Sequence, residues 1–158
     1  MTMQPQAEIG IIRGDSVSLV AIGEIMESAF DAAYGEAWTV SQCSAILGMP
    51  GSWLLLAEES HQPSGFALTR SGGGDAELLL IAVKKMQQNR GVGEALLRAV
   101  IADARARGIE RLFLEVRSCN PAIRVYKRAG FSKIGERRDY YRGKNGLLYD
   151  AHSYRLVL

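Results

Sequence analysis

LLLIAVKKMQQNRGVGEALLRAVIADARARGIERLFLEVRSCNPAIRVYKRAG, residues 78–130, is the stretch that decides the fold. Its pattern predicts a strand, a glycine-bearing loop, a helix, a second strand and a capped helix. The loop at residues 88–93 lies where a strand leads into a helix, so its backbone N–H groups can bind an anion. Gly91 and Gly93 allow the backbone to approach such a ligand closely. We interpret this stretch as a site for a phosphate-bearing cofactor that also carries the catalytic residues.

The elements within this stretch follow from apolar spacing. Residues 76–83 are apolar enough for a central strand that is buried on both faces. Residues 92–104 carry one apolar stripe and predict a helix, which Gly108 ends. Residues 111–116 predict the next strand, which completes a β-α-β unit. Asn120 is expected to cap the following helix, with Pro121 at its first position and Gly130 past its end.

The flanking sequence adds mostly strands. We expect strands at residues 7–13, 53–58, 65–70, 131–140 and 149–156. A helix capped by Asp15 or Ser16 should run to about residue 30, and a short one after Thr39 or Ser41 should end at residue 47. The glycines at 72–74 predict a hairpin turn, since no helix begins after them. The sequence therefore predicts a single α/β domain over residues 1–158, built on a mixed sheet.

Composition excludes several classes of protein. The chain has 158 residues and a net charge of +2, which is too small to imply nucleic-acid binding. It contains no run of about 18 apolar residues, which a membrane helix requires. The N-terminus lacks the pattern of a secretory signal, so we expect a cytoplasmic protein with free thiols at Cys43 and Cys119. No Cys/His spacing suggests a metal site.

A dinucleotide-binding loop is the main alternative for residues 88–93, because it also follows a strand and opens a helix. That motif requires a third glycine three residues after the second, and Leu96 stands there. It also usually opens a chain of alternating strands and helices, whereas strand-rich sequence comes first in this chain. The sequence therefore favours a different kind of phosphate site.

Several short motifs together resemble the GNAT acetyltransferase superfamily. They are Ile81-Ala82-Val83, Gln88-x-x-Gly91-x-Gly93, the run from Leu112 to Arg117, Asn120, Tyr126 and Ala129-Gly130-Phe131. The run LEVR-S-x-N-x-A-x-x-x-Y-x-x-x-G-F resembles the bacterial ribosomal-protein-alanine N-acetyltransferases, a subgroup that acetylates a protein N-terminus. Lys85 and Asn89 depart from the usual family pattern, but neither departure removes a residue needed for the chemistry.

The resemblance implies a GNAT-like fold, with a mostly antiparallel mixed sheet of about six to seven strands flanked by about four helices. It also implies acetyl-CoA as co-substrate and no metal. The pantetheine arm would pair with the 81–83 backbone like an added strand, at an edge opened near Val83, often through a bulge. The residues implied in cofactor binding are Ile81, Ala82, Val83, Gln88, Asn89, Arg90, Gly91, Val92, Gly93, Glu94, Asn120 and Tyr126.

Two residues are candidates for proton transfer. Glu115 lies on the strand face opposite Leu112 and Leu114, and we expect it to be the general base, directly or through water. The alternative is a surface glutamate that pairs with Arg117 or Arg111. Tyr126 is the candidate general acid for the leaving thiolate, and its alternative is an ordinary core aromatic. Asn120 either orders the site or only caps a helix.

Direct transfer in a ternary complex is the expected route. A covalent route through Cys119 is the alternative, but no adjacent histidine supports it. The acceptor is expected to be a primary amine, most plausibly a protein N-terminus. Aromatic side chains suited to its pocket are Trp38, Tyr34, Tyr140 and Tyr141, with Glu36 as an acidic contact.

Two further functions stay open at this point. One is acetylation of a small amine, such as an antibiotic, a polyamine or an amino acid. The other is a CoA-binding module without turnover, against which Glu115 and Tyr126 argue. The sequence does not indicate the oligomeric state.

Overall fold

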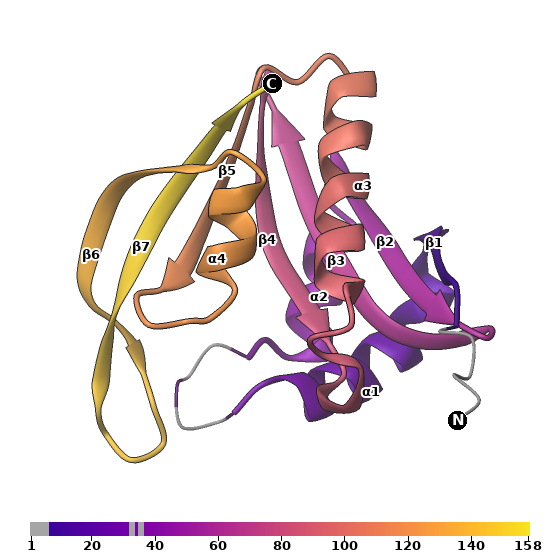
Figure 1. The fold of residues 1–158 in the computed structure, drawn as a ribbon, viewed down its shortest axis with the longest axis horizontal. Coiled ribbons are helices and arrows are strands. Elements are labelled where there is room, and N and C mark those ends of the chain that lie inside the picture. The colour runs from indigo at the N-terminus through magenta and orange to yellow at the C-terminus, as the bar shows by residue number, and fades with distance from the viewer. Residues whose placement is uncertain (1–6, 32–33, 35–36) are drawn as a thin grey trace, which may run out of the picture.

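The computed structural model describes residues 7–31, 34 and 37–158. Within these residues, seven strands form one sheet in the order β1-β2-β3-β4-β5-β7-β6, in which only β4 and β5 run parallel. Helices α3 and α4 cover one face, whereas α1 and α2 cover the other (Figure 1). This architecture confirms the predicted mixed, mostly antiparallel sheet. The strands are β1 (Ile9–Gly14), β2 (Ser52–Glu59), β3 (Gln62–Gly72), β4 (Asp75–Val83), β5 (Arg111–Arg117), β6 (Ser132–Arg142) and β7 (Leu148–Val157).

The helices are α1 (Leu19–Ala29), α2 (Val40–Leu47), α3 (Val92–Ala106) and α4 (Ile123–Arg128). The helix predicted from residue 15 or 16 is divided. Asp15 caps the short 3-10 turn η1 (Ser16–Ser18), and α1 follows. Thr39 caps α2 as expected, because its hydroxyl accepts the Gln42 N–H and the Gln42 side chain accepts the Thr39 N–H. None of the helices in the described part of the chain is long and apolar enough to cross a membrane.

Tight turns join the strands of the first half. Ser60 and His61 connect β2 to β3, and Gly73 and Gly74 connect β3 to β4. All four residues have positive φ, between 50° and 87°. Two consecutive positive φ angles match the right-handed twist of a hairpin. The glycines at 72–74 therefore belong to a hairpin turn, as predicted.

A bulge in β4 changes which side chains face which helix. Leu80 pairs with Leu68 and Leu78 pairs with Thr69, which leaves Leu79 as an extra residue. Leu78 packs in the cluster with α3, whereas Leu80 packs in the cluster with α1. In a regular strand, residues two apart share a face. The bulge thus explains how one apolar run contributes to the apolar clusters on both faces of the sheet. We expected a bulge near Val83, and the observed bulge at Leu79 lies four residues earlier.

The sheet separates into two halves beside this bulge. The ladder between β4 and β5 joins only residues 75–77 to residues 111–113. On its other edge, β5 pairs with β7 along its whole length. Figure 1 shows β4 and β5 diverging toward their C-terminal ends. The edge of β4 therefore has no β5 partner after Glu77, whereas we predicted that this edge would open near Val83.

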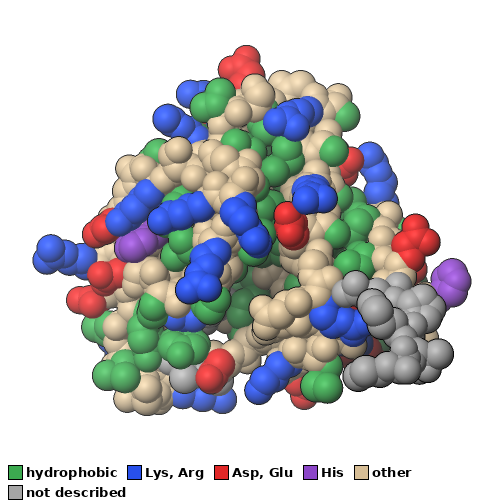
Figure 2. Space-filling model, in the orientation of Figure 1, with side chains coloured by type: hydrophobic (Ala, Val, Ile, Leu, Met, Phe, Trp, Pro, Cys, Tyr) green, Lys and Arg blue, Asp and Glu red, His purple; other side chains and the backbone are tan. Residues whose placement is uncertain are grey.

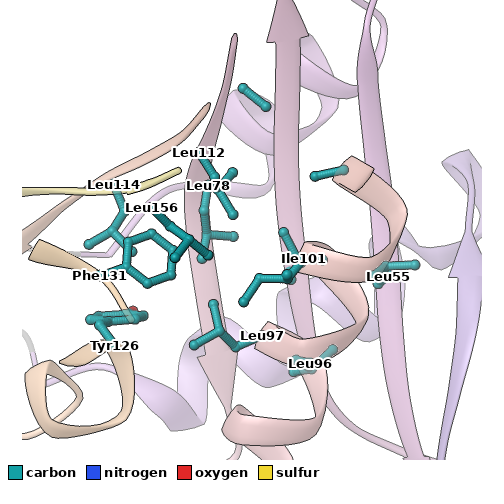
Figure 3. Packing of buried hydrophobic residues seen from close by; sticks show 14 of the residues in the cluster. Leu55, Leu78, Leu96, Leu97, Ile101, Leu112, Leu114, Tyr126, Phe131 and Leu156 are labelled. Carbon is teal, nitrogen blue, oxygen red and sulfur yellow. The ribbon is translucent and has the colours of Figure 1, made fainter. Parts of the chain in front are cut away.

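Two apolar clusters hold the sheet between the helices. The larger one contains the buried stripe of α3, and Figure 3 shows Leu97 and Ile101 pointing toward Leu78. Tyr126 and Phe131 belong to the same cluster and meet edge to face. Burial of this stripe confirms the predicted helix and fixes its N-terminus over the end of β4.

The start of α4 differs from the prediction. The helix begins at Ile123 with Ala122 as its N-cap, so Asn120 is not the cap and Pro121 is not helical. The Asn120 side-chain oxygen instead accepts the Ala122 N–H at 2.9 Å. The Ile123 N–H donates to the Asn120 carbonyl, which makes a turn ahead of the helix. Asn120 therefore orders the entry to α4 from outside it.

Candidate active site

A cavity of about 80 Å³ occupies the place where β4 and β5 separate. Three parts of the chain enclose it: the two strands, the entry to α4, and aromatic side chains from the α1–α2 connection and β6. Figure 2 shows the face that carries α3 and α4 hollowed near its centre, with Lys and Arg side chains around the hollow. The lining residues are Phe30, Trp38, Leu78, Leu79, Leu80, Ile81, Leu114, Glu115, Val116, Asn120, Tyr126 and Tyr141.

The end of β4 presents backbone groups on the side that β5 has left. The Lys84 N–H donates to the Ser64 carbonyl at 2.8 Å, so this residue pairs with β3. In an antiparallel ladder, the residues on either side of such a pair face away from the partner strand. The peptide groups of Ile81 and Val83 therefore face the opened side. The Val83 carbonyl faces this side and accepts a hydrogen bond from the Gln88 side-chain amide at 3.0 Å.

The segment at residues 84–93, here called the cofactor loop, leads from β4 into α3. Gly91 is the N-cap of α3, has a φ of 87° and makes no side-chain cap. The first N–H groups of α3 are thus left to water or to a ligand, and the helix dipole favours an anion there. A Cβ on Gly91 would meet no atom within 4 Å, so the positive φ accounts for glycine here.

Two charged side chains of the loop and the first turn of α3 are held in ion pairs. Arg90 pairs with Glu59 of β2 at 3.2 Å, and Glu94 pairs with Arg98 one turn further along α3. Asn89 has a φ of 62°, which asparagine tolerates better than most residues. The Arg90 charge is thus paired with a carboxylate, whereas the backbone N–H groups at the start of α3 stay available to an anion.

Glu115 lies on the face of β5 that does not carry α3. Arg137 of β6 reaches across β7 and places its Nε 3.0 Å from Glu115 Oε1. The Ser153 hydroxyl donates to the same oxygen at 3.4 Å. The ion-pair partner of Glu115 is thus Arg137 and not one of the two arginines named as alternatives: Arg111 pairs with Asp75, and Arg117 donates to the Cys119 sulfur at 2.8 Å. Both contacts of Glu115 use Oε1, so Oε2 is the oxygen left for a ligand in the cavity.

Glu77 is a second carboxylate on the same face, which the sequence did not single out. It stands opposite Phe113 in the short parallel ladder. Burial raises the pKa of Glu77, the charge of Glu115 raises it further, and Arg137 opposes both. These causes place Glu77, Glu115 and Arg137 in one electrostatic cluster beside the cavity.

Tyr126 is a buried core aromatic that also lines the cavity. Its side chain is 6% exposed and packs edge to face on Phe131 at 6.0 Å between ring centres. It also lines the cavity, on the side opposite β4 and together with Asn120. The structure thus brings Glu115, Asn120 and Tyr126 to one cavity. The Tyr126 ring is held in place by the core that surrounds it.

The four aromatic candidates for the acceptor pocket divide into two pairs. Trp38 and Tyr141 line the cavity, as does Phe30, which the sequence analysis missed. Tyr34 does not; its ring lies 3.7 Å from the Arg117 guanidinium and edge-on to Tyr149. Tyr140 is half exposed and packs edge-on against Tyr141 outside the cavity. Glu36 lies outside the described residues.

Both cysteines are free thiols, as predicted. Cys43 is buried in α2, and burial raises the pKa of its thiol. Cys119 is exposed and is not among the residues that line the cavity. Among residues 7–31, 34 and 37–158, no group of three His, Cys, Asp or Glu side chains is placed to hold a metal ion.

Comparison with known proteins identifies similar chains. A model of the Acetyltransferase (GNAT) family matches residues 19–131. The [ribosomal protein bS18]-alanine N-acetyltransferase of Escherichia coli is 39% identical over 89 residues, and that of Haemophilus influenzae is 34% identical over 88. Each of these matches covers 56% of this chain and 60% of the relative. The chain therefore spans less than two thirds of the length of these curated relatives.

A likeness in three dimensions extends further along the chain. The crystal structure of the ribosomal-protein-S18-alanine N-acetyltransferase from Escherichia coli matches with a TM-score of 0.85 at 29% identity. This match covers 95% of this chain and 94% of the other. It includes β6 and β7, which the family model does not reach.

Proposed function

The chain belongs to the GNAT acetyltransferase family, and on that premise we propose that it acetylates the N-terminal α-amine of a ribosomal protein that begins with alanine. Acetyl-CoA is the acetyl donor in this family. The observation that carries the proposal is one cavity lined by Glu115 from β5 and Tyr126 from α4, at the point where β4 and β5 separate. A base and an acid on one cavity suit transfer to an amine.

The described residues fit acetyl-CoA at two places. The peptide groups of Ile81 and Val83, free of β3, would pair with the amides of the pantetheine arm. The first N–H groups of α3, behind Gly91 and Gly93, would hold the pyrophosphate. Ala82 would shape the strand, and Gln88, Asn89, Arg90, Val92 and Glu94 would shape the loop. When bound, acetyl-CoA supplies an acetyl group that is activated as a thioester.

Glu115 takes the proton from the acceptor amine, directly or through one water. Arg137 and Ser153 hold Oε1 of its carboxylate, and Oε2 accepts the proton. An α-amine titrates near ~8, whereas a lysine amine titrates near ~10.4. A carboxylate base therefore finds more neutral amine at an N-terminus than at a lysine, which favours an α-amine acceptor.

Tyr126 donates its phenolic proton to the thiolate that leaves when the amine is acylated. Its position is fixed by the edge-to-face contact with Phe131, so little reorganisation is required during the reaction. Asn120, at the entry to α4, completes this side of the cavity and would contact the pantetheine arm.

The two substrates would approach from opposite faces of the sheet. The cofactor loop and α4 lie on the face of α3. Glu115 lies on the other face, and Phe30 and Trp38 pack against the cluster under α1. The acceptor would therefore enter beside Phe30, Trp38 and Tyr141, with Tyr34 and Tyr140 supporting this rim from outside the cavity. A ribosomal protein as acceptor would place the reaction in the cytoplasm.

The test is a CoA-release assay with a panel of acceptors. Peptides that begin with alanine, serine or methionine would be compared with an Nα-blocked peptide containing lysine, and with a polyamine and an amino acid. Release with the alanine peptide, at least tenfold faster than with the blocked peptide, supports the proposal. Release only with a small amine would identify a small-molecule acetyltransferase. CoA binding without release would identify a non-catalytic module.

A further inference from the structure

Two hydrogen bonds join the cofactor loop to the end of α1, far away in the sequence. The Lys85 N–H donates to the Ser28 hydroxyl oxygen at 2.9 Å. The Gln88 side-chain amide donates to the Ala29 carbonyl at 3.4 Å and to the Val83 carbonyl at 3.0 Å. Gln88 therefore connects the end of β4 to the end of α1. Its amide N–H groups are both used in these contacts.

These contacts lie at the C-terminal end of α1. Ala29 is the last residue of α1, and the chain turns extended at Phe30, with a φ of −111°. The last carbonyls of a helix have no partner within it and need a cap, water or another donor. The cofactor loop supplies such a donor to the Ala29 carbonyl through Gln88, and the Lys85 N–H donates to the Ser28 hydroxyl in the last turn of α1. The loop and the end of α1 are therefore joined directly.

The residue that follows Ala29 belongs to the cavity. Phe30 lines it, and Trp38 lines it from the far end of the same α1–α2 connection. We call Phe30 and Trp38 the acceptor wall, a name that rests on the proposed function. The Ala29 carbonyl bonded by Gln88 belongs to the peptide unit that links Ala29 to Phe30. The cofactor loop is therefore hydrogen-bonded directly beside one residue of the acceptor wall.

We propose that Ser28 and Gln88 are positioning residues that couple the cofactor loop to the acceptor wall. A ligand bound at the N–H groups of α3 fixes the loop, and Ser28 and Gln88 transmit that order to Phe30. The acceptor then binds to a wall that is already ordered, so it loses less conformational freedom on binding. The coupling is reciprocal, because each ligand must raise the affinity of the other by the same factor.

The test uses CoA as probe and hydrogen exchange as readout, so it does not require the acceptor. In the wild-type protein, CoA should slow exchange of the backbone amides at residues 26–31. In Ser28→Ala this slowing should fall by half or more, although CoA still binds. Ser28→Thr keeps the hydroxyl and should restore it. Ser18→Ala is the matched control, since Ser18 also accepts a backbone N–H, from Asp15 at 3.2 Å, beside the opposite end of α1.

A second arm measures the affinity of an alanine-initiated peptide with and without CoA. CoA should tighten binding about fivefold or more in the wild-type protein, and Ser28→Ala should bring this factor close to one. Equal slowing of exchange in the wild-type and Ser28→Ala proteins, or no slowing in either, would overturn the inference. If the wild-type protein does not bind the peptide, the proposed acceptor is wrong, and the exchange result alone decides the coupling.

Discussion

Arg137 on β6 reaches over the intervening strand β7 to Glu115 on β5, and its Nε lies 3.0 Å from the carboxylate oxygen Oε1. Ser153 on β7 donates to the same oxygen. The base of the proposed reaction is thus oriented by two side chains from neighbouring strands. Neither contact uses the second oxygen, Oε2, and Glu115 lines the same cavity as Tyr126.

Glu115→Gln should lower kcat by about 100-fold or more, because the amide keeps the shape of the carboxylate but cannot accept the proton. The dissociation constant of acetyl-CoA should change little, since the cofactor contacts lie on β4 and α3. Steady-state rates together with calorimetry of CoA binding would measure both. Glu110→Gln, at an exposed glutamate just before β5, is the matched control and should keep full activity. An unchanged kcat in Glu115→Gln would remove Glu115 from the reaction.

Tyr126→Phe should lower kcat by about 10- to 100-fold through loss of the phenolic proton. The phenyl ring keeps the edge-to-face contact with Phe131, so the melting temperature should change little. Tyr154→Phe alters another buried tyrosine, one that does not line the cavity, and serves as control. If both variants lost activity equally, Tyr126 would be an ordinary core aromatic.

Cys119→Ala should keep turnover within about twofold of wild type and unfolding free energy within about 0.5 kcal/mol. Direct transfer does not require the thiol, which is exposed, outside the cavity and beside Arg117. Rates and thermal melts of the variant would check this. Loss of turnover with CoA binding intact would instead indicate an acetyl-cysteine route.

Glu77→Gln should stabilise the protein at neutral pH. The pKa of Glu77 is raised in the folded protein above its ordinary value of 4.5, first by burial and then by Glu115. Its contribution to stability is therefore present below about pH 4.5 and is lost as the pH rises through the folded pKa. Because the Glu77 side chain is exposed, solvent screens this effect, and we expect a gain of only a few tenths of a kcal/mol at pH 7 that vanishes near pH 4.

Thermal melts of wild type and Glu77→Gln at both pH values would measure this difference. Glu110→Gln, at an exposed position, should show no such pH dependence. A variant that is less stable than wild type at pH 7 would contradict the assigned environment of Glu77.

Local signals explain why much of the fold was predictable. The Thr39 cap, the stripe of α3 and the glycine turn at 73–74 depend on residues close together in the sequence. The cofactor loop was predictable for the same reason, since its glycines and the start of α3 are adjacent. The start of α4 was misplaced because Asn120 forms a turn that resembles a cap in sequence.

Features that depend on strand pairing were not predictable. The run from Leu78 to Val83 is apolar throughout, so nothing in it marks Leu79 as the extra residue. The opening of the sheet after Glu77 depends on β5 preferring β7 as its partner. The ion pair of Arg137 with Glu115 needs β6, β7 and β5 in their final order. The sequence therefore indicated the catalytic candidates but not what orients them.

Mass spectrometry of a single acceptor peptide would show whether the enzyme transfers acetyl to an N-terminal α-amine. A peptide that begins with alanine and contains one internal lysine would be incubated with the enzyme and acetyl-CoA, then fragmented. We expect a gain of one acetyl group, located on the N-terminal residue and absent with Glu115→Gln. An acetyl group on the lysine alone, or a peptide of unchanged mass while a small amine is acetylated, would contradict it.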